Sequence, residues 1–149
     1  MRRAIALARA VVGTTAPNPP VGCVIVARGR IVGEGATAAG GRPHAEELAL
    51  AAAGEGARGA TAYVTLEPCG ARSCGVASCA ERLASEGIAR VIYAADNPDA
   101  LSAGRGPARL RAGGVAVEAG FLAAQTEALY ADAKKGDASP RRPSEFLGG

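Results

Sequence analysis

The stretch Pro43-His44-Ala45-Glu46-Glu47-Leu48-Ala49-Leu50-Ala51-Ala52-Ala53 combines a strong helix signal with the only histidine of the chain. Residues 45–53 favour a helix that stops before Gly54. Pro43 suits the first turn of that helix, because an N–H group there has no partner inside the helix anyway. A single imidazole, His44, therefore stands at a helix entrance, two residues before the carboxylate of Glu46.

The segments around this helix alternate between helical and strand patterns. Apolar residues at helical spacing predict a helix over residues 2–12, and a continuous apolar run predicts a buried strand over 21–27. A tight turn at Arg28-Gly29 leads into a second strand at 30–35, which predicts a hairpin. Further strands are expected at 61–66, 89–95 and 115–119, and further helices at 79–86, 105–112 and 122–135. This order predicts an α/β fold with helices on both faces of a sheet.

Length and composition place limits on the type of protein. The 149 residues fit one domain, expected over residues 1–135, and the run 136–149 is expected to be a flexible tail. The net charge of +3 is weak and neither requires nor excludes an anionic partner. No apolar run approaches the ~18 residues of a membrane span, and the N-terminus lacks the pattern of a signal peptide. We therefore expect a cytoplasmic location and no membrane association.

Four cysteines, Cys23, Cys69, Cys74 and Cys79, permit either two disulfides or a metal site. In a reducing compartment, clustered cysteines favour metal or redox chemistry. A catalytic zinc site holds three nitrogen, sulfur or oxygen ligands and leaves a fourth position open to water. His44, Cys69 and Cys79 supply that set. All three are expected at or just before helix starts, whose partial positive charge favours thiolates. Zn²⁺ is therefore the expected cofactor.

Glu46 is the expected catalytic proton shuttle. Residues i and i+2 do not share a helix face, but both can approach a metal that lies off the end of the helix. Glu46 would take a proton from the water that zinc activates, pass it to a ring nitrogen and later protonate the leaving amine. The third protein ligand remains open between Cys74 and Cys79. Cys79 is preferred because it stands where a loop turns into a helix.

Four short stretches of the sequence together resemble one known family. They are Thr15-Ala16-Pro17-Asn18-Pro19-Pro20-Val21-Gly22, Pro43-His44-Ala45-Glu46, Ala60-Thr61-Ala62-Tyr63-Val64-Thr65-Leu66-Glu67-Pro68-Cys69 and Ala103-Gly104-Arg105-Gly106. Over about residues 1–125 the chain resembles the deaminase domain of the bifunctional riboflavin-biosynthesis deaminase–reductase. The His-x-Glu, Pro-Cys and Cys elements are also those of the wider group of zinc-dependent nucleobase deaminases.

The resemblance implies a fold, a substrate and two substrate contacts. The implied fold is the cytidine deaminase-like three-layer α/β/α sandwich around a mixed five-stranded sheet. The implied substrate is the diaminohydroxyphosphoribosylaminopyrimidine of riboflavin biosynthesis. Asn18 would hydrogen-bond the pyrimidine or its sugar, and Arg72, in the loop between Cys69 and Cys79, would contact the ribose phosphate. The resemblance also implies a homo-oligomer, a dimer or larger, and it does not include the reductase domain of the family.

The sequence departs from the family pattern on the substrate side and keeps the metal side. Gly70 and Ala71 stand where the family carries one or two histidines, Leu48 stands where asparagine is common, and Asn97-Pro98-Asp99-Ala100 replaces Asp-Pro-Asn-Pro. A deaminase of another free base, nucleoside or nucleic-acid base, such as a tRNA adenosine deaminase, is therefore the first alternative. Nucleic acid is disfavoured because few rings are available for base stacking. An idle deaminase fold kept for protein contacts is the second alternative, and the intact Glu46 argues against it.

Overall fold

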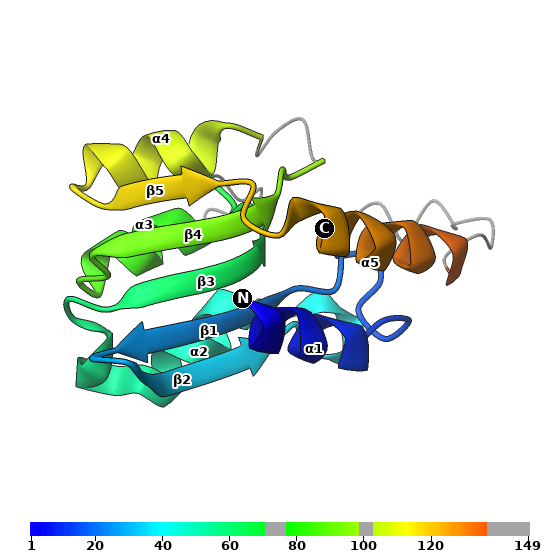
Figure 1. Cartoon of the computed structure of the whole chain (residues 1–149), viewed down its shortest axis with the longest axis horizontal. Coiled ribbons are helices and arrows are strands. Elements are labelled where there is room, and N and C mark those ends of the chain that lie inside the picture. The colour runs from blue at the N-terminus through cyan, green and yellow to red at the C-terminus, as the bar shows by residue number, and fades with distance from the viewer. Residues whose placement is uncertain (71–76, 99–102, 137–149) are drawn as a thin grey trace.

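The computed structural model describes residues 1–70, 77–98 and 103–136 of the chain (Figure 1). The helices in this part are α1 (Arg2–Ala10), α2 (Ala45–Ala53), α3 (Cys79–Ser85), α4 (Arg105–Ala112) and α5 (Ala123–Gly136), with short 3₁₀ helices η1 (Ala39–Gly41) and η2 (Gly54–Ala57). The strands are β1 (Gly22–Ala27), β2 (Arg30–Ala36), β3 (Thr61–Leu66), β4 (Arg90–Ala95) and β5 (Ala116–Ala119). Apart from Gly136, the expected tail lies outside the described residues. Among the helices described, none has both the length and the apolar composition needed to cross a bilayer.

The strands of the described part form one mixed sheet in the order β2-β1-β3-β4-β5. β1 pairs antiparallel with both β2 and β3, whereas β3, β4 and β5 run parallel. The hairpin expected at Arg28-Gly29 is confirmed, and its register shifts between Ile25 and Val26. Parallel neighbours require a crossover connection, and α3 and α4 provide the two crossovers from β3 to β4 and from β4 to β5.

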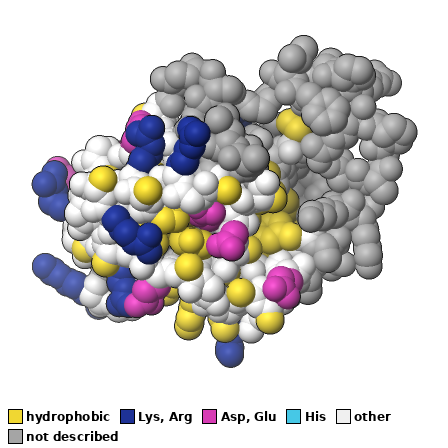
Figure 2. Space-filling view, turned by 90° about the horizontal axis from the view of Figure 1, so that it is seen from above, with side chains coloured by type: hydrophobic (Ala, Val, Ile, Leu, Met, Phe, Trp, Pro, Cys, Tyr) yellow, Lys and Arg dark blue, Asp and Glu magenta, His cyan; other side chains and the backbone are white. Residues whose placement is uncertain are grey.

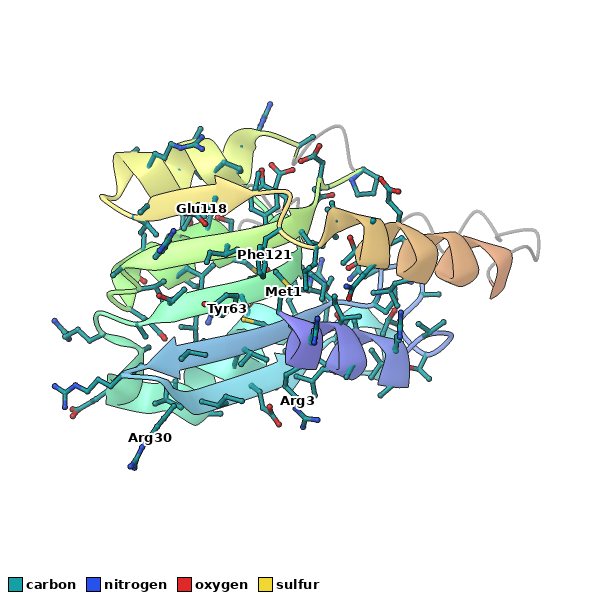
Figure 3. All side chains as sticks on the ribbon, in the orientation of Figure 1. Met1, Arg3, Arg30, Tyr63, Glu118 and Phe121 are labelled. Atoms are coloured by element: carbon teal, nitrogen blue, oxygen red, sulfur yellow. The ribbon has the colours of Figure 1, made fainter. Side chains whose placement is uncertain are left out.

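Helices cover both faces of the sheet, so the predicted three-layer sandwich is confirmed. In Figure 1, α1 and α5 lie in front of the sheet, α2 and α3 lie behind it, and α4 lies beside the β5 edge. The core between these layers is almost entirely aliphatic. Its largest fully buried apolar side chains include Ile25, Val64, Leu83, Val91 and Leu110. Figure 3 adds the side chains to this frame. Because successive residues of a strand point to opposite faces of the sheet, both helical layers can bury apolar surface against it.

Glycines in β1 and β2 allow two helices to lie close to the sheet. A Cβ atom on Gly22 would lie 1.9 Å from the carbonyl oxygen of Ala4 in α1. A Cβ atom on Gly35 would lie 2.7 Å from the carbonyl oxygen of Ala45 in α2. Both distances are far shorter than van der Waals contact, so α1 and α2 reach these positions only because the two residues lack side chains. The second contact fixes the height of the first turn of α2 above the sheet.

Two expectations about helix ends are wrong by two residues. α1 ends at Ala10, and Val11 leaves the helical conformation with φ −110° and ψ 4°, consistent with the lower helix propensity of the β-branched Val11-Val12 pair. Pro43 does not stand in the first turn of α2. The helix begins at Ala45, and His44 is its N-cap, with the extended backbone angles φ −71° and ψ 158°. The N-cap position suits His44 because its backbone N–H can then donate a hydrogen bond to the Glu47 carboxylate of the first turn.

Candidate active site

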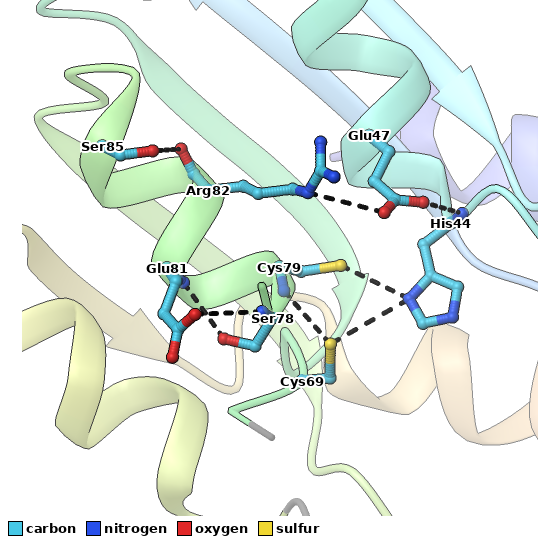
Figure 4. Close-up of polar contacts among 8 residues, drawn as sticks. All are labelled: His44, Glu47, Cys69, Ser78, Cys79, Glu81, Arg82 and Ser85. Carbon is cyan, nitrogen blue, oxygen red and sulfur yellow. Dashed lines mark hydrogen bonds and ion pairs between the residues drawn. The ribbon is translucent and has the colours of Figure 1, made fainter. Parts of the chain in front are cut away.

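The three side chains expected to bind metal lie together at one end of the sheet (Figure 4). His44 Nδ1 lies 3.3 Å from Cys79 Sγ and 4.0 Å from Cys69 Sγ. The ligand atoms of all three residues lie within 4.8 Å of one another. His44 caps α2, Cys79 begins α3, and Cys69 follows β3. The fold therefore unites residues from three separate elements at one point.

Both helices that carry a site residue are fixed at their first turn by a glutamate three residues after the cap. Glu47 accepts a hydrogen bond from the backbone N–H of His44 at 2.8 Å. At the start of α3, Ser78 Oγ accepts the N–H of Glu81 at 3.2 Å, and the Glu81 carboxylate accepts the N–H of Ser78 at 3.3 Å. This reciprocal arrangement is a capping box, whose Ser-x-x-Glu spacing is visible in the sequence. The caps hold the backbone from which the His44 and Cys79 side chains extend.

Cys69 does not stand at a helix start in the chain, so that part of the expectation is wrong. It lies three residues beyond the end of β3, but the fold brings it to the start of α3, where the N–H of Cys79 donates to its Sγ at 3.2 Å. Hydrogen bonding by the Cys79 side chain lowers the pKa of Cys69 to about 4; burial opposes this shift, and His44 and the Cys79 N–H add to it. Cys69 is thus poised as a thiolate, the form that binds metal.

Glu46 lies buried beside this cluster, with only 4% of its surface exposed. Burial raises the pKa of its carboxyl group, and the nearby charge of Cys69 raises it further. His44, the backbone N–H of Glu46 and a hydrogen bond with the Cys79 side chain act in the opposite direction. The carboxyl group of Glu46 is therefore hydrogen-bonded with Cys79 and close enough to His44 and Cys69 to interact with their charges.

The donor set of the cluster fits a zinc ion. Zinc binds imidazole nitrogen at about 2.0–2.1 Å and thiolate sulfur at about 2.3 Å in tetrahedral geometry, so a nitrogen and a sulfur ligand lie about 3.6 Å apart. The two distances from His44 Nδ1 to sulfur, 3.3 and 4.0 Å, lie on either side of that value. Three protein donors leave one tetrahedral position for a water molecule, which is the arrangement of a catalytic zinc site.

Two ion pairs around the cluster were not foreseen from the sequence. Glu47, which accepts the N–H of His44, also lies 3.6 Å from Arg82 Nε of α3. Glu81, which caps α3, lies 2.6 Å from Arg109 of α4. The capping glutamates are visible in the sequence as i, i+3 pairs. Their arginine partners come from other helices, and only the packing of α2, α3 and α4 brings them within reach.

Of the two expected substrate contacts, one lies in the described part of the chain. Asn18 Nδ2 donates to the backbone carbonyl oxygen of Gly41 at 2.8 Å, and the backbone carbonyl oxygen of Asn18 accepts from Thr15 Oγ1 at 2.8 Å. These bonds join the loop before β1 to η1, which leads to His44. Substrate binding by Asn18 stays a prediction. Arg72 and the alternative ligand Cys74 lie outside the described residues.

Comparison with known proteins identifies the family of this constellation. The family model described as the cytidine and deoxycytidylate deaminase zinc-binding region matches residues 1–95, which include His44, Glu46, Cys69 and Cys79. The chain belongs to this deaminase family. Zinc is accordingly the metal of this region, in agreement with the nitrogen and sulfur donors brought together by the fold.

Relatives within the family confirm the resemblance stated from the sequence. Riboflavin biosynthesis protein RibD of Escherichia coli (strain K12) is 48% identical over 129 residues, which are 87% of this chain and 35% of that protein. Diaminohydroxyphosphoribosylamino-pyrimidine deaminase of Buchnera aphidicola is 44% identical over 127 residues, which are 85% of this chain and 86% of that protein. The structure of Acinetobacter baumannii RibD, form 2, superposes with a TM-score of 0.83 at 42% identity, covering 93% of this chain and 39% of that one.

The extent of these matches differs between the relatives. The chain spans about 35% of the length of the RibD relative from Escherichia coli and 86% of the length of the Buchnera deaminase. The match to the solved RibD structure confirms the cytidine deaminase-like fold that was expected from the sequence.

Proposed function

We propose that this chain catalyses the zinc-dependent hydrolytic deamination of an aminopyrimidine, the diaminohydroxyphosphoribosylaminopyrimidine of riboflavin biosynthesis. The observation that carries the proposal is the buried carboxyl group of Glu46 beside a cluster of one imidazole and two thiols. A structural zinc site has no use for such a carboxylate, whereas a deaminase requires one. The pyrimidine assignment is supported by the 44% identity to the Buchnera deaminase of that name, most of whose length the chain covers.

In the proposed mechanism His44, Cys69 and Cys79 hold the metal, and Glu46 moves the protons. Bound zinc would supply a Lewis acid that lowers the pKa of the water that reacts. Glu46 would accept one proton of that water and donate it to the ring nitrogen next to the carbon that bears the amino group. Glu46 would then pass the second proton of the water to the leaving amine. Water and the amino-substituted carbon are thereby converted into a carbonyl group and ammonia.

The pyrimidine itself would be oriented by the loops next to this centre. Asn18 is the proposed contact for the base or its sugar, and its bond to Gly41 ties the two loops that precede β1 and α2. Arg72 is the proposed contact for the ribose phosphate. We also propose that residues 1–135 form the deaminase domain, that residues 136–149 are its flexible tail, that the protein acts in the cytoplasm, and that it forms a homo-oligomer.

A small molecule is preferred over nucleic acid as the substrate. Tyr93 is 6% exposed, and Tyr130 packs against the core, so neither ring is available as a stacking platform. On the face at the β5 edge, several of the Lys and Arg side chains lie beside Asp or Glu, and further acidic side chains lie among apolar ones near the middle, so the visible part of this face is of mixed charge (Figure 2). Single-stranded nucleic acid instead calls for a basic groove lined by exposed rings.

The substrate is tested by measuring ammonia release from four compounds. The purified zinc-loaded chain is incubated with the diaminopyrimidine phosphoribosylamine, cytidine, guanine or a tRNA stem-loop. The proposal expects the phosphoribosylamine to react fastest. Faster release from any of the other three would favour a different deaminase. No release from any of them, at full zinc occupancy, would favour an idle deaminase fold.

The role of Glu46 is tested separately with the isosteric substitution Glu46→Gln. The variant should keep its zinc and its fold but lose about 10²–10⁴-fold in kcat, because a positioned acid–base group contributes that much. Glu55→Gln is the matched control, since Glu55 lies in η2 and is exposed. Near-normal turnover by Glu46→Gln would exclude the proposed proton transfer.

A further inference from the structure

A second buried carboxylate lies next to the metal cluster, and the proposed mechanism does not use it. Glu67 is 4% exposed and stands two residues before Cys69. Its carboxylate accepts the backbone N–H of Asn97 at 2.8 Å and the backbone N–H of Gly104 at 2.6 Å. One side chain thus binds both flanks of the segment that connects β4 to α4.

Further bonds fix Glu67 itself at the ends of two neighbouring strands. Its N–H donates to the carbonyl oxygen of Ala95 at 2.8 Å, and its carbonyl oxygen accepts from Asn97 Nδ2 at 3.3 Å. The backbone of Glu67 therefore continues the pairing of β3 with β4 beyond Leu66. Its carboxylate then reaches Gly104, the N-cap of α4. The ends of β3 and β4 and the start of α4 meet at this residue.

The start of α4 lies directly against the backbone that carries Cys69. A Cβ atom on Gly106 would lie 1.9 Å from the carbonyl oxygen of Pro68. A Cβ atom on Gly70 would lie 2.4 Å from the carbonyl carbon of Arg105 and from the nitrogen of Gly106. Both glycines are required by this close approach. The Gly-Arg-Gly run and the Glu-Pro-Cys run are distant in the sequence, and the two glycines allow their backbones to lie in contact.

The burial of a carboxyl side chain at position 67 requires an explanation. A buried carboxylate is costly unless its oxygens are hydrogen-bonded, and an apolar side chain would fill the same space without that cost. The two N–H groups that donate to it belong to Asn97, just after β4, and to Gly104, the N-cap of α4. The carboxylate therefore ties the start of α4 to the end of β4, next to the backbone that carries Cys69.

We propose that Glu67 is a positioning residue for the metal centre, which sets the place of Cys69 by holding the start of α4 against the Pro68–Gly70 backbone. The proposal rests on the metal-binding part of the proposed function and not on the identity of the substrate. It assigns Glu67 the role of an outer partner that orients a metal ligand, and loss of such partners typically lowers metal affinity about 10–100-fold.

The test compares Glu67→Gln and Glu67→Ala with the wild-type chain. Glutamine has the same shape but presents an NH₂ group to one of the two N–H donors, whereas alanine removes both acceptors. Zn²⁺ affinity is measured by competition with a chromogenic chelator, and the Co²⁺-substituted proteins are compared by their absorption spectra. Both variants should bind Zn²⁺ about 10–100-fold more weakly, alanine more so than glutamine, with shifted thiolate-to-Co²⁺ bands. Glu34→Gln, which removes an exposed ion pair with Arg3, is the matched control and should change neither.

A lower melting temperature with unchanged Zn²⁺ affinity and an unchanged Co²⁺ spectrum in Glu67→Gln would overturn the proposal, because Glu67 would then only stabilise the fold. Gly106→Ala gives an independent check, since its methyl group must push α4 away from Pro68. It should shift the Co²⁺ spectrum as the Glu67 variants do, and an unshifted spectrum in folded Gly106→Ala would also contradict the proposal. None of these readouts uses deamination, so a negative substrate screen leaves this test standing.

Discussion

The ion pair between Glu47 and Arg82 joins the two helices that present His44 and Cys79, and its removal is expected to weaken their association measurably. The Glu47 carboxylate lies 3.6 Å from Arg82 Nε, and the two side chains are 14% and 40% exposed. Arg82 Nε is buried and has no hydrogen-bond partner in the part of the chain that is described. The attraction to Glu47 is therefore the interaction that compensates the burial of this nitrogen.

The expected size follows from the distance and the exposure. Opposite unit charges 3.6 Å apart attract by about 4–5 kcal/mol at an effective dielectric constant of about 20. Solvent around the partly exposed Arg82 and the entropy of fixing a long side chain reduce this strongly, and exposed pairs contribute only about 0.2–1 kcal/mol. Because the Glu47 end is largely buried, we expect a coupling of about 1 kcal/mol, at the upper end of that range.

The coupling is measured with a double-mutant cycle. Glu47→Gln, Arg82→Met and the double variant are unfolded in urea, metal-free, and their free energies of unfolding are compared with that of the wild type. The cycle is necessary because Glu47 also accepts the N–H of His44, so a single substitution removes more than the ion pair. A coupling below about 0.3 kcal/mol, the usual error of additivity, would refute the inference that this pair joins α2 to α3. The coupling should also fall when the salt concentration is raised, since solvent reaches one partner.

Three further outcomes are expected. Gly22→Ala should lower the free energy of unfolding in urea by about 1–3 kcal/mol, because the added methyl group would overlap the backbone of α1. Gly56→Ala is the control: its added Cβ would lie 3.4 Å from the nearest atom, so the free energy of unfolding should change by less than about 0.5 kcal/mol. Equal effects of the two substitutions would contradict this account of the close approach. In the metal-free protein at about pH 6, iodoacetamide should modify Cys69 before Cys23, as located by mass spectrometry. The pKa of Cys69 is lowered to about 4, so this thiol is ionised at pH 6, whereas burial raises the pKa of Cys23. Faster labelling of Cys23 would refute this prediction. Cys79→Ala should abolish bound zinc while Cys74→Ala retains it, and the reverse result in metal analysis would make Cys74 the third ligand.

Local patterns in the sequence were sufficient for most of the elements. Helix propensity and Gly54 predicted the body of α2 and its end at Ala53, and the apolar runs predicted β1 and β3 within one residue. Errors fall where local signals compete. Pro43 is compatible with a first helical turn. In the structure, however, His44 is the N-cap and its N–H donates to Glu47, so the proline lies outside the helix.

The candidate site divides in the same way. His44, Glu46, Cys69 and Cys79 could be proposed from residue type and order alone, because few side chains bind zinc and only one histidine is present. The capping glutamates Glu47 and Glu81 can also be found from their i, i+3 spacing, but their arginine partners cannot. Arg82 pairs with Glu47 of another helix, and only the packed structure shows this pair.

What the sequence by itself determined is therefore the set of elements, the donor atoms and the family to which their order belongs. Beyond the hairpin of β1 and β2, only the tertiary structure decided which strand lies beside which, and that the Cys69 sulfur accepts the N–H of Cys79 although the two residues are ten positions apart. It also decided that Glu67 accepts the N–H groups of Asn97 and Gly104. The physical reason is the range of the interactions involved: propensity, capping and periodicity act over a few residues, whereas these contacts exist only after the sheet and its crossover helices have packed.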